Sequence, residues 1–386
     1  MYFGRYVYVC ANQTVMNDKR KMKSVEEEAL MDLFVSRILI DWYESHKRAL
    51  PWRETTDPYL IWVSEIILQQ TRVAQGLDYF LRFTERFPTV QALAEAEEGE
   101  VLKYWQGLGY YSRARNLHAA AKQLVERYGG RFPRGYEEVL SLKGIGAYTA
   151  AAIVSFAWGM PYPVVDGNVY RVLARLFDLD TPIDSTDGKK QFAELAGRLL
   201  DPKRASSYNQ AIMEFGALQC VPRHPDCAVC PLVDRCMAYA RGRVEELPVK
   251  QHKTKIRDRY FHYLYLIYNK ETWLRRRPAG DIWEGLYEFP LIETEGPMDL
   301  ANLSQTATYR RWLGKAGELR FFRPLTGVKH VLSHQVLHTS FYGIELERAP
   351  EGLEDYLRIP LSEFERYAIP RLIHIYMEKM GGNLSE

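Results

Sequence analysis

Apolar residues recur at three- and four-residue spacing through most of the first 240 positions, the pattern of helices that bury one face. The spacing predicts helices over residues 28–48, 58–71, 74–86, 113–128, 136–142, 147–157 and 166–178. Asp57 followed by Pro58 supplies a capping carboxylate and a proline suited to the first helical turn. Gly129 and Gly130 supply a helix stop. We therefore expect residues 25–240 to be almost entirely helical.

The pattern changes after position 240. Residues 241–260 contain seven lysines and arginines against three acids, which indicates a basic linker over residues 241–257. Beyond it, residues 260–268, 286–292 and 337–344 are rich in aromatic and β-favouring side chains. Helical patterns near residues 300–313 and 362–380 alternate with these strands. Residues 258–386 are therefore predicted to form a smaller α+β domain.

Composition narrows the class of protein. A chain of 386 residues suits two domains better than one, since single cores stop growing near ~250–300 residues. The net charge of +2 is weakly basic, which permits a nucleic-acid partner without requiring one. The sequence contains no run of ~18 apolar residues, so it predicts no membrane-spanning helix. Residues 1–24 are too short and aromatic in their apolar part for a signal peptide, so we expect a dispensable N-terminal extension and a cytoplasmic protein.

Four of the five cysteines cluster in the order Cys220-x6-Cys227-x2-Cys230-x5-Cys236, while Cys10 stands apart. A disulfide scaffold would spread its cysteines along the chain, so this cluster predicts a metal centre in a reducing compartment. Zinc is one reading, because four thiolates are a common zinc site. Zinc ribbons usually use two CxxC pairs, however, and this loop of residues 220–236 has one.

A glycine pair marks the segment between two predicted helices, at Leu142-Lys143-Gly144-Ile145-Gly146 within about residues 136–157. Gly144 and Gly146 permit a tight turn and the close approach of another chain. The helix that follows presents free N–H groups, so the segment is suited to binding a phosphate without reading sequence, and Lys143 adds a cation. A plain turn between two helices has the same pattern, so the motif alone is weak.

Two carboxylates are candidates for acid–base chemistry. Glu65 lies within the apolar helix Trp62–Thr71, where it is either on a solvated stripe or desolvated with a raised pKa. Asp166 follows an apolar run in Val164-Val165-Asp166-Gly167-Asn168. At the start of a helix it serves either as an N-cap or as a catalytic group.

Taken in order, these motifs resemble the helix-hairpin-helix glycosylases of the endonuclease III superfamily, and most closely the MutY-type adenine glycosylases. The cysteine spacing resembles the [4Fe–4S] loop of that superfamily. Asp166 lies about twenty residues after the hairpin, as in the family, and Glu65 occupies the position of the MutY general acid, which endonuclease III lacks. The resemblance implies a mostly α glycosylase region with an iron–sulfur loop, followed by an α+β Nudix-like domain.

Two further features separate the MutY type from endonuclease III. Tyr148 stands where endonuclease III has the lysine that forms a Schiff base, so the resemblance implies a monofunctional enzyme. The C-terminal region resembles a Nudix domain but lacks the Arg-Glu-x-x-Glu-Glu run that binds metal, so it should bind rather than hydrolyse. Leu332-Ser333-His334 resembles the Phe-Ser-His loop with which MutY proteins recognise oxidised guanine, and departs from it in having leucine first.

The resemblance implies removal of adenine opposite 8-oxoguanine, or guanine, from double-stranded DNA by a monomeric enzyme. Glu65 would protonate the flipped adenine, and Asp166 would stabilise or attack the oxocarbenium-like sugar. Tyr148 and Asn168 would orient these carboxylates. The expected DNA and substrate contacts are Trp52, Arg53 and Leu68 around the base, Gln70, Thr71 and Tyr110 in the stack, Lys143, Gly144 and Gly146 on phosphate, and Leu332, Ser333 and His334 on the opposite base.

Three alternatives stay open at this point. An endonuclease III-like lyase or a thymine-mismatch glycosylase shares most of these motifs, and Tyr148 is compatible with the second. A DNA-binding scaffold without turnover would have no need for Glu65 and Asp166. A Nudix hydrolase with a helical adaptor would require the metal-binding run that the sequence lacks.

Overall fold

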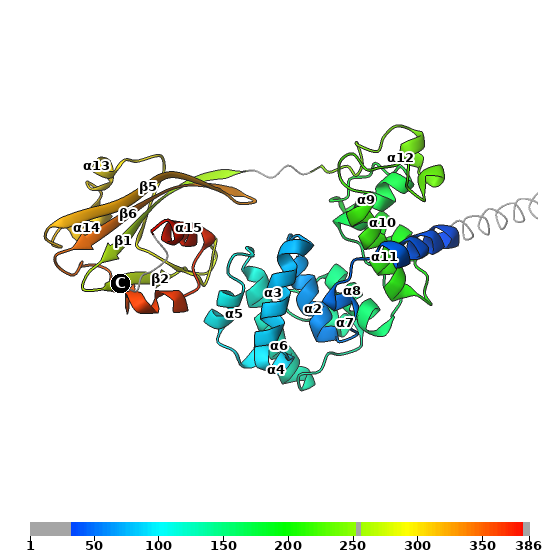
Figure 1. Cartoon of the computed structure of the whole chain (residues 1–386), viewed down its shortest axis with the longest axis horizontal. Coiled ribbons are helices and arrows are strands. Elements are labelled where there is room, and N and C mark those ends of the chain that lie inside the picture. The colour runs from blue at the N-terminus through cyan, green and yellow to red at the C-terminus, as the bar shows by residue number, and fades with distance from the viewer. Residues whose placement is uncertain (1–31, 252–255, 381–386) are drawn as a thin grey trace, which may run out of the picture. The chain divides into compact units, whose positions relative to one another are not determined.

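Residues 32–251 and 256–380 are described by the computed structural model (Figure 1). The expected N-terminal extension (residues 1–24) and Cys10 lie outside the described residues, as do positions 252–255 of the expected linker. Contacts divide the chain into two units. Unit 1 comprises Met1–Ile66 and Phe132–His252, and unit 2 comprises Ile67–Arg131 and Lys253–Glu386. The helical region is thus split, because its middle part groups with the C-terminal region.

Unit 1 is helical. Its elements are a helix over residues 32–46, the 3-10 turn η1 (Pro51–Arg53), most of α2 (Pro58–Leu68), α7 (Tyr136–Leu140), α8 (Ala147–Trp158), α9 (Gly167–Leu176), α10 (Thr186–Leu199), α11 (Ala205–Leu218), η2 (Val233–Arg235) and α12 (Met237–Ala240). Buried side chains of the first helix, α8, α9, α10 and α11 form one core. The α8 sequence is apolar on nearly every side because the helix is buried along most of its length.

The helical part of unit 2 consists of α3 (Val73–Arg86), α4 (Val90–Glu95), α5 (Glu98–Tyr104) and α6 (Ser112–Tyr128). These helices surround the fully buried Trp105, whose ring meets that of Phe83 edge-on with centroids 5.9 Å apart. Gly129 ends α6 with φ of +60°, as the glycine pair predicts.

The C-terminal part of unit 2 contains two sheets. The strands are β1 (Arg257–Ile267), β2 (Glu271–Arg276), β3 (Tyr287–Glu288), β4 (Leu291–Thr294), β5 (Leu319–Val331), β6 (Gln335–Leu346) and β7 (Leu357–Pro360). Their orders are β4-β1-β6-β5 and β3-β2-β7, and β1 pairs with β6 in parallel. On one face of the larger sheet packs α15 (Arg371–Met380), beside η3 (Leu361–Arg366). The short α13 (Leu300–Leu303) and α14 (Ala307–Leu313) cover the other face.

Several elements differ from the sequence-based expectation. The α2 helix ends at Leu68 rather than at position 71, and the helices α4, α5, α10 and α11 lie in the region expected to be helical but were not delimited individually. The expected strand over 286–292 is two strands, because Pro290 has no N–H to continue the ladder. Strand β5 was not predicted, because Pro324 and Gly327 interrupt its sequence pattern. The register of its pairing with β6 shifts twice in this region.

Residues 241–251 of the expected linker belong to unit 1 and pack against its core. Leu247 is buried in the unit 1 core. Arg241 and Arg243 both form ion pairs with the buried Asp178, at 2.5 Å and 3.0 Å. The excess of basic residues here therefore includes partners of a buried carboxylate. In the ranges that the structure describes, no helix has the length and apolarity needed to span a bilayer.

Candidate active site

Glu65 is buried in α2, with only 7% of its surface exposed. Burial raises the pKa of this carboxyl to about 7, and the nearby charge of Asp166 adds to the rise. The Tyr148 hydroxyl, from the first turn of α8, donates a hydrogen bond of 2.6 Å to Glu65 Oε2, and this bond lowers the pKa of Glu65. Of the two sequence-based readings, the structure therefore has the desolvated glutamate, poised to exchange a proton near neutral pH.

Asp166 caps α9 and lies close enough to Glu65 for the two charges to interact. Its Oδ1 accepts hydrogen bonds from the backbone N–H of Asn168 (2.9 Å) and Val169 (2.8 Å). The Asn168 side-chain amide donates to Oδ2 at 2.8 Å. Burial raises the pKa of Asp166, whereas these three donors lower it by stabilising the carboxylate. The capping role and a chemical role are thus compatible in one residue.

Arg53 and Glu214 form an arrangement that the sequence analysis did not anticipate. Glu214 on α11 is almost fully buried, and Arg53 donates to both of its oxygens at 2.8 Å and 2.6 Å. Arg48 binds the same carboxylate. Although burial opposes it, the two guanidinium groups lower the pKa of Glu214 to about 2. Arg53, expected beside the flipped base, is therefore held in an ion pair, and the adjacent Trp52 is buried in η1.

The glycine segment between α7 and α8 forms the predicted hairpin. Gly144 has φ of +75°, a conformation that favours glycine, and Ile145 N–H closes the turn on the Leu142 carbonyl at 3.1 Å. Gly146 caps α8 from extended backbone. Lys143, Gly144 and Gly146 are exposed on the turn. An exposed turn that ends in a helix N-terminus is suited to contact a phosphate.

All four clustered cysteines line one small cavity of unit 1, within the loop of residues 220–236 that follows α11. Arg175 from α9 lies at the same cavity and is 2% exposed. Its guanidinium donates to the Val221 and Pro222 carbonyls at 2.7 Å and 2.9 Å, and approaches Cys220 Sγ at 3.4 Å. The neighbouring Arg171 donates to the Cys220 carbonyl and to Asn168 Oδ1, at 2.7 Å and 2.9 Å. The loop is therefore fixed to the helix that Asp166 caps.

The chemistry of this cavity fits a metal cluster. Burial raises the pKa of the Cys230 thiol to about 11, so a thiolate here requires a neighbouring positive charge such as bound iron. Within residues 32–251 and 256–380, no group of three or more cysteine, histidine or acidic side chains closes around a single ion. Four closely grouped cysteines are a donor set suited to zinc or to an iron–sulfur cluster.

Gln70 and Tyr110, which the sequence places in the DNA stack, lie on two turns of unit 2. Both are exposed and both have positive φ, +57° for Gln70 and +47° for Tyr110. Thr71 follows in the same turn, and its hydroxyl donates to the Gln69 carbonyl at 3.3 Å. Leu68 packs against Gly76 of α3, where an added Cβ would lie 2.7 Å from its side chain.

Leu332, Ser333 and His334 form the turn between β5 and β6. Leu332 packs against the core beneath α15, so leucine fills the apolar role at the position where the sequence departs from the family pattern. Ser333 and His334 are exposed. The Ser333 hydroxyl shares a hydrogen bond of 2.5 Å with the Tyr110 hydroxyl. Unit 2 therefore brings two separately predicted segments together.

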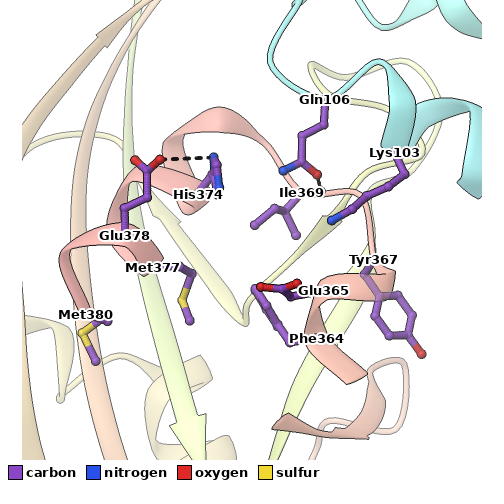
Figure 2. A pocket seen from close by; sticks show the side chains of 10 residues that line it. All are labelled: Lys103, Gln106, Phe364, Glu365, Tyr367, Ile369, His374, Met377, Glu378 and Met380. Atoms are coloured by element: carbon purple, nitrogen blue, oxygen red, sulfur yellow. Dashed lines mark hydrogen bonds and ion pairs between the residues drawn. The ribbon is translucent and has the colours of Figure 1, made fainter. Parts of the chain in front are cut away.

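Unit 2 has a cavity of about 250 Å³ between the end of α5 and the segment from η3 to α15 (Figure 2). Gln106 reaches across it and accepts a hydrogen bond from the Ile369 N–H at 3.2 Å. Lys103 also lines it, as do His374 and Glu378, whose side chains form an ion pair of 3.8 Å when the histidine is protonated. None of the residues predicted from the sequence lines this cavity.

The helical region with its hairpin and the paired carboxyls define a helix-hairpin-helix DNA glycosylase, and the comparison with protein families agrees with this class. Residues 63–200 match the model described as HhH-GPD superfamily base excision DNA repair protein. Residues 262–379 match the NUDIX domain. A solved structure entitled thermostable thymine-DNA glycosylase superposes with a TM-score of 0.51 at 29% identity, and covers 54% of this chain and 97% of that one.

Curated relatives narrow the class further. The adenine DNA glycosylase of Buchnera aphidicola (strain APS) is 32% identical over 354 residues, which cover 90% of this chain and 98% of the relative. The adenine DNA glycosylase of Mus musculus is 34% identical over 364 residues, or 81% of this chain and 70% of the relative. The chain belongs to the adenine DNA glycosylases, the MutY family. The resemblance derived from the sequence is thereby confirmed.

Proposed function

We propose that this adenine DNA glycosylase acts on adenine paired with 8-oxoguanine or guanine in duplex DNA, and that Glu65 and Asp166 perform the reaction. One observation carries the proposal. A buried carboxyl with a pKa of about 7 receives a hydrogen bond from Tyr148 and senses the charge of Asp166. Two carboxyls in different environments suit an acid and a charge-stabilising partner.

Adenine inside the duplex is out of reach, so the nucleotide is first flipped out of the stack. Tyr148 engages Oε2 of Glu65, and the proton for the base therefore resides on Oε1. Transfer of that proton to N7 makes the base a better leaving group, and the bond between C1′ and N9 breaks with its electron pair moving to the base. Glu65 is left as a carboxylate, and the sugar develops oxocarbenium character.

Asp166 meets this positive charge, either through space or by forming a bond to C1′. The three hydrogen bonds from Asn168 and Val169 favour its ionised form. Water then adds at C1′, and where Asp166 has bonded there the bond breaks with its electron pair returning to the carboxylate. The water gives up a proton, which restores Glu65. Tyr148 has no amine with which to form a Schiff base, so strand cleavage is not part of the reaction.

Recognition of the pair belongs to unit 2. The exposed side chains of Gln70 and Tyr110 would enter the stack, and those of Ser333 and His334 would contact the base opposite adenine. The hydrogen bond between the Tyr110 and Ser333 hydroxyls supports the proposal that these segments form a single surface for recognising the base pair. Lys143, Gly144 and Gly146 would bind the backbone. The enzyme is proposed to act as a monomer.

Cys220, Cys227, Cys230 and Cys236 would hold a [4Fe–4S] cluster. When bound, the cluster supplies a covalent link among the segments of the loop that Arg175 and Arg171 fasten to α9. The step at the sugar is carried by the carboxylates alone.

The function is tested with labelled duplexes that contain adenine opposite 8-oxoguanine, adenine opposite thymine, or thymine opposite guanine. We expect cleavage of the first duplex only, only after alkali treatment, and its loss in Glu65→Gln. Release of thymine from the thymine–guanine pair would favour the thymine-mismatch alternative. Strand breaks without alkali would favour a lyase.

A further inference from the structure

We propose that Arg113 is a positioning residue that fixes Gln70 and Tyr110 relative to each other, so that both enter the DNA stack as one wedge. This inference rests on the proposed function, which assigns the two side chains to the stack. The residues that carry it all belong to unit 2.

Arg113 connects the two turns through its guanidinium. It is 9% exposed and lies in the first turn of α6. Its Nη1 donates to the carbonyls of Ile67, at 3.1 Å, and of Gln69. Its Nη2 donates to the carbonyls of Leu108 and Gly109 at 3.4 Å and 3.2 Å. One flat group therefore spans two segments that are about forty residues apart in the chain.

Two of the four carbonyls that Arg113 binds immediately precede the residues to be positioned. Gln69 comes directly before Gln70, and Gly109 directly before Tyr110. Both following residues have positive φ, a conformation that non-glycine residues adopt only where their surroundings impose it. The guanidinium also lies over the Tyr110 ring, 5.5 Å from its centroid. Arg113 thus holds the backbone directly before each of the two residues with positive φ.

The Ile67 and Gln69 carbonyls lie at the C-terminal end of α2, where the last carbonyls lack helical partners and a cation is favoured. Lysine would supply the charge but not the fork of donors that reaches four carbonyls. The centroid of the Trp105 ring lies 5.2 Å from the guanidinium carbon of Arg113, and the indole N–H of Trp105 donates to the same Gly109 carbonyl at 3.1 Å. The arrangement therefore requires the shape of arginine as well as its charge.

The experiment compares Arg113→Lys with Arg127→Lys, which changes an exposed arginine in the last turn of the same helix. Each full-length variant is bound to a duplex containing a non-hydrolysable adenosine opposite 8-oxoguanine, with 2-aminopurine beside the pair to report unstacking. We expect Arg113→Lys to lose the fluorescence increase and to lower the single-turnover rate by about 10²-fold. Affinity for undamaged duplex should change less than twofold, and Arg127→Lys should match the wild type.

A double-mutant cycle separates positioning from general stability. In a Gln70→Ala/Tyr110→Ala background, Arg113→Lys should cause no further loss of rate, because the residues through which it acts are gone. An additional loss of the same size in that background would overturn the proposal, as would a wild-type rate for Arg113→Lys. All reactions are run below the melting temperature of the least stable variant. If wild-type protein releases no adenine, the proposed function fails, and unstacking in the thymine–guanine duplex still tests Arg113.

Discussion

At the scale of single residues, the site depends on how burial and hydrogen bonding divide protons between carboxyls. Glu65 and Glu214 are both buried in unit 1, and their pKa values move in opposite directions. Two arginines compensate the charge of Glu214, whereas the Glu65 carboxyl accepts a hydrogen bond from the neutral Tyr148 hydroxyl. Charge compensation, more than depth of burial, therefore decides which glutamate is available as an acid.

Glu65 should make the protein less stable at alkaline pH. Its pKa is about 7 when folded and near 4.5 when unfolded, so only the unfolded chain releases the proton between these values. Stability then falls as pH rises across this window, by about 3 kcal/mol at ~1.4 kcal/mol per pKa unit. Glu65→Gln should be inactive yet melt at higher temperature than wild type at pH 8, with equal melting at pH 4. Equal melting at both pH values would contradict the assigned pKa.

Tyr148→Phe should change the pH profile of adenine release. The hydroxyl lowers the pKa of Glu65, so its removal should move the alkaline limb of the single-turnover rate to higher pH. We also expect a roughly tenfold slower rate at pH 6, because the acid is less well oriented. Tyr136→Phe is the matched control, since that hydroxyl donates a hydrogen bond of 3.5 Å to the Ala147 carbonyl. An unshifted limb in Tyr148→Phe would count against Glu65 as the acid.

At the scale of elements, function is concentrated where helices and strands end. The hairpin precedes α8, Asp166 caps α9, and Leu332–His334 turn between β5 and β6. Exposed backbone groups and single side chains can face DNA at such ends, while the elements themselves provide rigidity.

The two hairpin glycines should respond differently to alanine. Gly144→Ala forces a side chain into φ of +75° and should destabilise the fold by about 1 kcal/mol. Gly146→Ala introduces no contact within 4 Å at an ordinary φ of −97°, so thermal melting should stay unchanged. Its methyl group should nevertheless obstruct a phosphate and weaken duplex binding. Tight DNA binding by Gly146→Ala in a filter or anisotropy assay would exclude this turn as the backbone contact.

At the scale of the whole molecule, the proposed chemistry belongs to unit 1 and the proposed recognition to unit 2. This division predicts that the two can be changed separately. Ser333→Ala should reduce the preference for 8-oxoguanine over guanine opposite adenine by about tenfold, the effect of losing ~1.4 kcal/mol of contact energy. The pH dependence of adenine release should remain that of wild type. A changed pH profile would show that Ser333 acts on the acid rather than on the opposite base.

The sequence by itself determined the helical and α+β regions, the cap at Asp57-Pro58, the hairpin, the cysteine loop and the two carboxylates. Each of these depends on local spacing or on a residue type suited to one task, which is visible along the chain. Only the tertiary structure decided whether Glu65 is desolvated, because its burial depends on residues distant in sequence, such as Tyr148. Only the tertiary structure, likewise, pairs Arg53 with Glu214. It also decided where α2 ends. The periodicity continues to position 71, but Gln70 has a positive φ, and the carbonyls of Ile67 and Gln69 accept hydrogen bonds from Arg113, which is distant in the sequence.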